Sequence, residues 1–164
     1  MTAAKTPLLA LALLCACAVD QREVPLATGD LAAHRDHVHP LLEASCATLD
    51  CHGDFRRPLR IFSEIGLRRR TELRGTPITE QELESNVASL LGVDPSAVGE
   101  GRHLALLKPL AEGAGGVHHV GEDLWPDRQD AAYLCLAGWM RGDGAAAIAG
   151  DCAAGLAPVR LPDP

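Results

Sequence analysis

Two cysteines and a histidine stand close together in the segment Cys46-Ala-Thr-Leu-Asp-Cys51-His52-Gly53. The histidine directly follows the second cysteine, so whatever fixes Cys51 also fixes the position of His52. Four residues separate the cysteines. If both sulfur atoms act at one site, the loop between them must bulge, and the rest of the chain must fold around it.

This order of residue types is typical of covalent haem attachment. In such a site each thiol adds across a haem vinyl group to form a thioether, and the adjacent histidine ligates the iron. The usual spacing is C-x-x-C-H, whereas this chain has C-x4-C-H. We interpret Cys46 and Cys51 as the attachment residues of one haem c and His52 as its proximal ligand.

Two alternatives for the same residues remain open at this stage. Cys46 and Cys51 could form a disulfide in a haem-free, disulfide-stapled envelope lipoprotein with a binding or structural role. Alternatively, Cys46, Cys51, His52 and a loop histidine could bind Zn²⁺, although an oxidising compartment disfavours free thiolates.

The sequence around this segment resembles a group of small bacterial c-type cytochrome-like lipoproteins. In that group a V-x-P-x-L helix leads into C-A-x-x-x-C-H-G, and here Val38-His39-Pro40-Leu41-Leu42 precedes Cys46. Further matches are Lys108-Pro109-Leu110, the run from Gly115 to Gly121, Tyr133, and Gly138-Trp139-Met140-Arg141-Gly142. The resemblance implies a mainly α, cytochrome c-like helical domain with long loops that wrap a haem, and one-electron transfer to a redox partner protein.

The N-terminus has the pattern of an export signal. Lys5 supplies a short charged region, and Pro7 to Leu14 form an apolar stretch too short to remain as a membrane span. The Leu14-Cys15-Ala16-Cys17 run looks like a bacterial lipobox. Cys17 would then be acylated and anchor the protein to a membrane face, with Cys15 as the weaker candidate and cleavage without lipidation as the alternative.

We therefore expect a periplasmic or outer-membrane lipoprotein of the cell envelope. Its expected parts are a signal peptide over 1–16, a tether over 17–30, a cytochrome c-like domain over 31–145 and a C-terminal tail over 146–164. In an oxidising compartment Cys135 and Cys152 should pair, because neither lies in a ligand motif. An exported protein with a net charge of −7 is not expected to bind nucleic acid.

The chain is 47% hydrophobic but only 3% aromatic, so Leu, Ala and Val must build the core and a haem would add apolar bulk. Helices are predicted over 30–45 with a break or kink at Pro40, over 80–91 behind the capping box Thr79 to Glu82, over 102–107, and over 127–141. The residues after Gly142 are expected to be loose apart from Cys152.

Further candidate ligands are histidines and one methionine. His119, in a loop with four glycines over 111–121, is the expected sixth iron ligand, with His118 or Met140 as alternatives. His34 and His37 could share a helix face and bind a metal, or be solvated, as could His39.

A run of seven arginines contrasts with the negative charge of the whole chain. These arginines could pair with haem propionates or an acidic partner protein, or form a solvated face; they are Arg56, Arg57, Arg60, Arg68, Arg69, Arg70 and Arg74. The sequence contains no nucleophile–base pair, phosphate loop or dinucleotide fingerprint, so we do not expect an enzyme. A five-coordinate haem beside a mobile His119 loop would still permit sensing or weak peroxidase activity.

Overall fold

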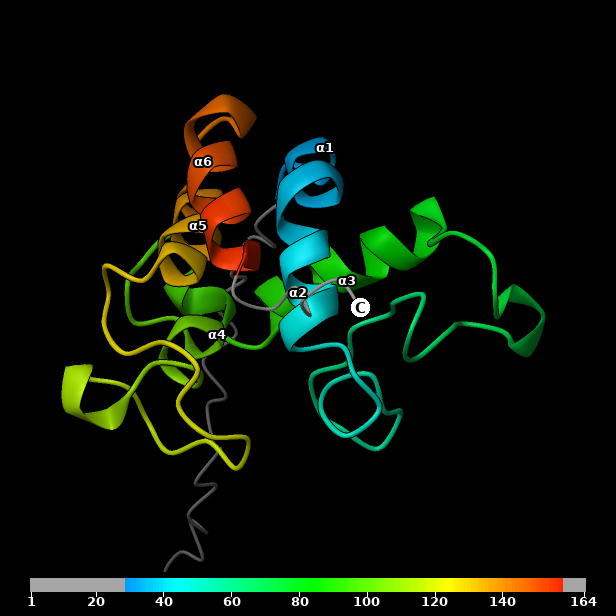
Figure 1. Cartoon of the computed structure of the whole chain (residues 1–164), viewed down its shortest axis with the longest axis horizontal. Coiled ribbons are helices and arrows are strands. Elements are labelled where there is room, and N and C mark those ends of the chain that lie inside the picture. The colour runs from blue at the N-terminus through cyan, green and yellow to red at the C-terminus, as the bar shows by residue number, and fades with distance from the viewer. Residues whose placement is uncertain (1–28, 158–164) are drawn as a thin grey trace, which may run out of the picture.

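Helices supply the regular structure of residues 29–157, which are the residues that the computed structural model describes (Figure 1). The elements are α1 Leu31–Ala33, α2 His39–Ser45, α3 Glu80–Gly92, α4 Leu104–Leu107, α5 Ala131–Arg141 and α6 Ala145–Leu156. Within this range no β-strand forms, and only isolated bridges join Phe62 to Leu67 and Leu110 to Trp125. The predicted mainly α class is confirmed. The predicted signal peptide and Cys17 lie outside the described residues.

The N-terminal helix is continuous from Leu31 to Ser45, but its middle is widened. Asp30 caps it by accepting a hydrogen bond from the Ala33 amide at 3.0 Å. Between α1 and α2, residues His34–Val38 form a π-helical turn that immediately precedes the first turn of α2, where Pro40 lies. Because proline lacks an amide hydrogen, we attribute the widened turn to Pro40. The expected break is therefore a local change of helical pitch.

The C-terminal residues differ from the expected loose tail. Residues 145–156 form α6, which packs against α5. The predicted Cys135–Cys152 disulfide joins the two helices. The approach is close: a Cβ at Gly155 would lie 2.7 Å from the Ala132 amide nitrogen. The helical domain thus extends to Leu156, beyond the expected boundary at residue 145.

The N-terminal helix contacts both α5 and α6 (Figure 1). The Trp139 indole on α5 donates a hydrogen bond to the Asp30 carbonyl oxygen at 2.9 Å and is only 2% exposed. Helix α5 begins at Ala131, later than the predicted residue 127. The reason is that the Asp130 carboxylate accepts from the amides of Ala132 and Tyr133 and so caps the helix there.

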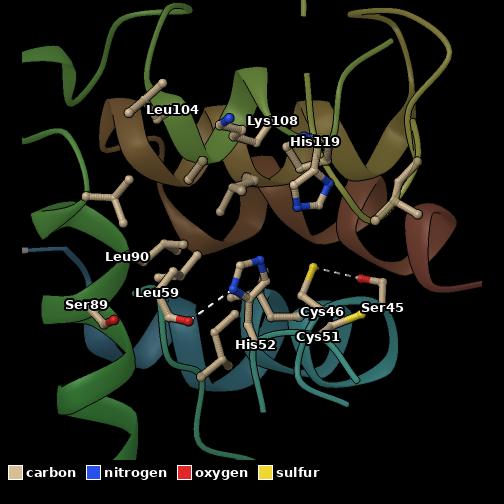
Figure 2. Close-up of a pocket in the computed structure, with 18 of the residues that line it drawn as sticks. Ser45, Cys46, Cys51, His52, Leu59, Ser89, Leu90, Leu104, Lys108 and His119 are labelled. Atoms are coloured by element: carbon tan, nitrogen blue, oxygen red, sulfur yellow. Dashed lines mark hydrogen bonds between the residues drawn. The ribbon is translucent and has the colours of Figure 1, made fainter. Parts of the chain in front are cut away.

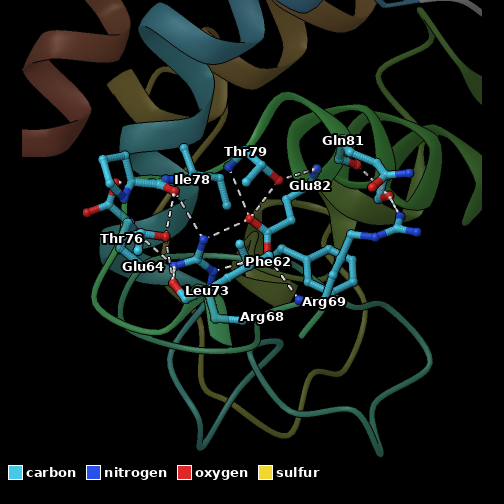
Figure 3. Close-up of polar contacts among 12 residues, drawn as sticks. Phe62, Glu64, Arg68, Arg69, Leu73, Thr76, Ile78, Thr79, Gln81 and Glu82 are labelled. Carbon is cyan, nitrogen blue, oxygen red and sulfur yellow. Dashed lines mark hydrogen bonds and ion pairs between the residues drawn. The ribbon is translucent and has the colours of Figure 1, made fainter. Parts of the chain in front are cut away.

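The capping box at α3 is present as predicted, and its glutamate has a second role. Glu82 accepts hydrogen bonds from Thr79 and also from the buried Arg68 guanidinium (Figure 3). Arg68 in turn donates to backbone carbonyls of the loop that ends at Thr79. This network fixes the long connection between α2 and α3, in which the only bridge is that of Phe62 with Leu67.

Candidate functional site

A cavity of about 580 Å³ lies between the C-terminal end of α2, α3, α4 and the loops that flank them (Figure 2). Its volume is in the range of small-molecule and cofactor sites, about 300–1,000 Å³. Most of its lining is apolar and includes Leu42, Leu90, Leu104 and Leu136. The site therefore suits a large ligand that is mainly apolar.

Both cysteines of the C-x4-C-H segment line this cavity. Cys46 follows α2 directly, and the loop then turns back, with the Cys51 amide donating to Thr48 and the His52 amide donating to the Cys46 carbonyl. This is the bulge that the four-residue spacer requires. It returns Cys51 and His52 to the same cavity that Cys46 lines.

Gly53 is required by the tightness of this loop. A Cβ at position 53 would lie 2.1 Å from the Ala47 carbonyl oxygen and 2.8 Å from that of Thr48. The same Ala47 oxygen accepts from the buried Ser63 hydroxyl. The glycine that ends the motif thus permits the backbone approach that places His52.

The two thiols are free in the structure, so the alternative Cys46–Cys51 disulfide is not formed. Burial raises the pKa of the Cys46 thiol, and a contact with the Ser45 hydroxyl acts in the opposite direction. Cysteine binds zinc as the thiolate, the form that a raised pKa disfavours. Within residues 29–157 no group of three or more His, Cys, Asp or Glu side chains could hold a metal ion. Neither observation supports the zinc alternative.

His52 is held firmly. Its ring Nδ1 lies 3.0 Å from the Leu59 carbonyl oxygen, and its own carbonyl accepts from the Ile61 amide at 2.9 Å. When Nδ1 donates its proton to this hydrogen bond, Nε2 of the neutral ring carries no proton. An unprotonated ring nitrogen is the atom that ligates a metal. Burial lowers the pKa of His52, while the Leu59 hydrogen bond opposes that effect. The imidazole is therefore neutral and oriented.

His119 faces His52 across the cavity (Figure 2). Their ring centroids are 6.1 Å apart and their planes differ by 8°. An imidazole nitrogen lies about 2 Å from a bound metal and roughly 1 Å from its own ring centre, so two rings on opposite sides of one ion have centres about 6 Å apart. A six-coordinate haem iron takes four ligands from the porphyrin and two from the protein. The histidine pair, the thiols and the apolar walls fit a haem.

The alternative sixth ligands do not line the cavity. His118 is exposed, with its Nδ1 at 3.4 Å from the Glu112 carboxylate. Met140 is 6% exposed and belongs to the hydrophobic core. Of the three candidates, His119 alone lines the cavity.

The possible metal pair was His34 with His37, but the structure places the His34 ring beside that of His39, with ring centroids 5.9 Å apart. The π-helical turn explains this contact, because its wider turn changes which side chains share a face. Both are buried, and none of their ring nitrogens has a hydrogen-bond partner among the described residues. The expected solvated state is therefore wrong for His34 and His39. His37 is half-buried.

The arginine run also lies apart from the cavity lining. None of its seven members, all within the described range, is a lining residue. Arg68 is buried against Glu82, and most of the others are exposed. The cation at the cavity is Lys108, which begins the Lys108-Pro109-Leu110 match but carries no sequence signal of a ligand-binding role.

Comparisons with protein-family models, curated proteins and solved structures found no match for this chain. Over residues 29–157, no helix combines the length and the apolar character needed to cross a membrane.

Proposed function

We propose that this protein binds one haem c covalently and carries single electrons in the cell envelope. The observation that supports this most strongly is the facing pair His52 and His119, 6.1 Å apart in one apolar cavity with two free cysteines. A second cavity, lined by residues that include Leu49 and Arg70, is smaller, with a volume of about 250 Å³. In this proposal the haem supplies one-electron redox chemistry.

Each residue has a defined role in the proposed site. Cys46 and Cys51 would hold the porphyrin through thioethers, and His52, oriented by Leu59, would ligate the iron. His119 would supply the second protein ligand. The apolar lining excludes water, which affects the reduction potential because a low dielectric disfavours the more charged oxidation state.

The location is part of the same proposal. The N-terminal apolar segment and Cys17 support export and lipid anchoring, so the protein would work on a membrane face and exchange electrons with a partner protein. Cys17→Ser should abolish acylation. Fatty-acid labelling that persists in this variant would contradict the anchor but leave haem binding unaffected.

The decisive experiment is expression with cytochrome c maturation enzymes, followed by acid–acetone extraction and a pyridine haemochrome spectrum. We expect one haem that stays with the polypeptide on extraction. A protein with Cys46→Ala and Cys51→Ala should lose all covalent haem, and single variants should show an altered haemochrome band because one vinyl group remains free. As a control, Ser96→Ala, at an exposed serine that does not line the cavity, should retain the haem. A wild-type protein without haem would contradict the proposal.

A further inference from the structure

The two facing histidines are held in very different ways. His52 is fixed by a ring hydrogen bond at 3.0 Å and by two backbone hydrogen bonds, at 2.8 and 2.9 Å. The His119 ring has one weak contact, from Nδ1 to the Glu122 carbonyl oxygen at 3.4 Å. One imidazole is therefore part of the folded framework, whereas the other depends on its loop.

The loop that carries His119 is fastened mainly at its ends. The Val117 amide donates to Leu107 at 3.0 Å, and the Leu124 amide donates to Pro109 at 2.8 Å. Between these points, the hydrogen bonds found in the described residues all involve a side chain. Besides the His119 contact, the Lys108 ammonium donates to the His118 carbonyl at 2.7 Å.

The same loop shows local strain and little packing. Glu122 has a φ of 76°, which lies in the left-handed region of backbone conformation. Residues other than glycine, asparagine and aspartate rarely adopt this conformation. Val120 is 86% exposed. Outward movement of residues 118–123 would release the strain at Glu122 and break few contacts.

The cavity that His119 lines is mainly apolar. Leu104, Pro109, Leu124 and Trp125 are among its lining residues, and Lys108 is the only Lys or Arg lining it in the described residues. A cavity wall of this kind has few groups that would stabilise a bound anion. Removal of the imidazole would therefore leave space suited to a small uncharged molecule.

We propose that His119 is an exchangeable ligand, and that the reduced protein binds small uncharged diatomic molecules in its place. This inference rests on the proposed haem function. The bond from His119 to the iron breaks, a bond from the incoming molecule forms, and no electron is transferred in the exchange. Such a protein would sense or bind a diatomic gas as well as carry electrons.

The test uses the haem-loaded protein, reduced with dithionite and mixed with carbon monoxide in a stopped-flow spectrometer. We expect a carbonyl spectrum at a rate that saturates with carbon monoxide concentration, because departure of His119 becomes limiting. His119→Ala should remove the saturation. Lys108→Met should raise the limiting rate roughly three- to tenfold, the effect of losing one hydrogen bond of ordinary strength at an exposed position. The control Arg102→Met, at an exposed cation paired with Glu100, should leave the rate unchanged.

The outcomes separate the two proposals. Protein without covalent haem contradicts the electron-transfer function itself. A low-spin haem that binds no carbon monoxide leaves that function standing and overturns exchange at His119. A limiting rate that is equal in wild type and Lys108→Met overturns control by this loop.

Discussion

Arg68 and Glu82 form a buried ion pair, with hydrogen bonds of 3.0 Å from Nε and 2.9 Å from Nη2 to the two carboxylate oxygens (Figure 3). Their side chains are 2% and 0% exposed. Burial raises the pKa of Glu82, but the hydrogen bonds from Arg68, Arg69 and Thr79 outweigh it and lower that pKa to about 2. The pair joins the loop after the C-x4-C-H segment to the start of α3.

Removal of one partner should be costly. Arg68→Met leaves the Glu82 carboxylate buried without its cation, and we expect the free energy of unfolding to fall by about 3–5 kcal/mol. Urea denaturation measures this loss. The double variant Arg68→Met with Glu82→Leu should recover part of it, because a buried pair can often be replaced by apolar groups. The exposed control Arg102→Met should change stability little. If Arg68→Met lowered the free energy of unfolding as little as Arg102→Met does, that result would contradict the structural role of the pair.

The buried His34 and His39 should make the fold sensitive to acid. Burial, followed by the nearby charge of His39, lowers the pKa of His34 to about 3, and burial also lowers that of His39. The unfolded chain takes up protons at these histidines near pH 6.5, whereas the folded chain does not. Stability is therefore full above about pH 6.5 and falls as the pH drops toward 3, by about 1.4 kcal/mol per pH unit for each proton taken up.

The measurement is urea denaturation from about pH 7 to about pH 5, above the range where Glu82 contributes. His34→Leu should reduce the slope of the unfolding free energy against pH by nearly the amount that one proton contributes, about 1.4 kcal/mol per pH unit. His37→Gln, at a half-buried position on the same helical segment, serves as the control. An unchanged slope in His34→Leu would show that His34 is not the group responsible.

Local sequence signals predicted α3 well and α6 badly, for a physical reason. The capping box and the apolar residues of α3 act within one helix, so they are visible in the sequence. Helix α6 has only Ile148 and Cys152 as buried residues and contains two glycines. It forms because it packs against α5 and is joined to it by the disulfide. These are tertiary contacts, which local sequence patterns do not reveal.

The same distinction applies to the site. The association of Cys46, Cys51 and His52 is local and was readable, whereas the facing position of His119 depends on α4 and the loop after it. The family resemblance pointed to His119, and spacing alone did not. The contact between His34 and His39 was missed because a regular helix places residues three or four apart on one face, and this helix is locally π.

The close approach at Gly53 gives a prediction about the attachment loop. Gly53→Ala should destabilise the protein by about 1–3 kcal/mol and reduce haem attachment, because its Cβ overlaps the Ala47 carbonyl. Gly150→Ala is the matched control, since nothing lies within 4 Å of its added Cβ in α6. That control should gain about 0.5–1 kcal/mol from helix propensity. Denaturation curves and the haem yield measure these effects. Equal stability and equal haem yield in the two variants would contradict the prediction.

The disulfide should contribute measurably to stability. Cys135 and Cys152 are separated by 17 positions, and closure of such a loop contributes about 3 kcal/mol in the chain-entropy model. The double variant Cys135→Ala with Cys152→Ala should lose about that amount in urea denaturation at pH 7. Thiol labelling of the denatured, unreduced protein should leave both cysteines unmodified. Labelling at these two positions would refute the pairing.

The axial ligands can be identified by spectroscopy of the haem-loaded protein. With His119 opposite His52, the oxidised protein should be low-spin and lack the weak sulfur-to-iron band of methionine ligation. Its reduction potential should lie below that of cytochromes with a histidine and a methionine ligand, because the thioether raises the potential.

Three variants separate the candidates. His119→Ala should give a high-spin haem that binds added imidazole, whereas the exposed neighbour His118→Ala should leave the spectrum unchanged. Met140→Leu should also leave it unchanged and cost less than about 1.5 kcal/mol, because the substitution nearly conserves volume in the core. A spectrum that changes only in Met140→Leu would move the ligand to sulfur and require α5 to turn a core residue toward the cavity, away from the packing that the structure shows.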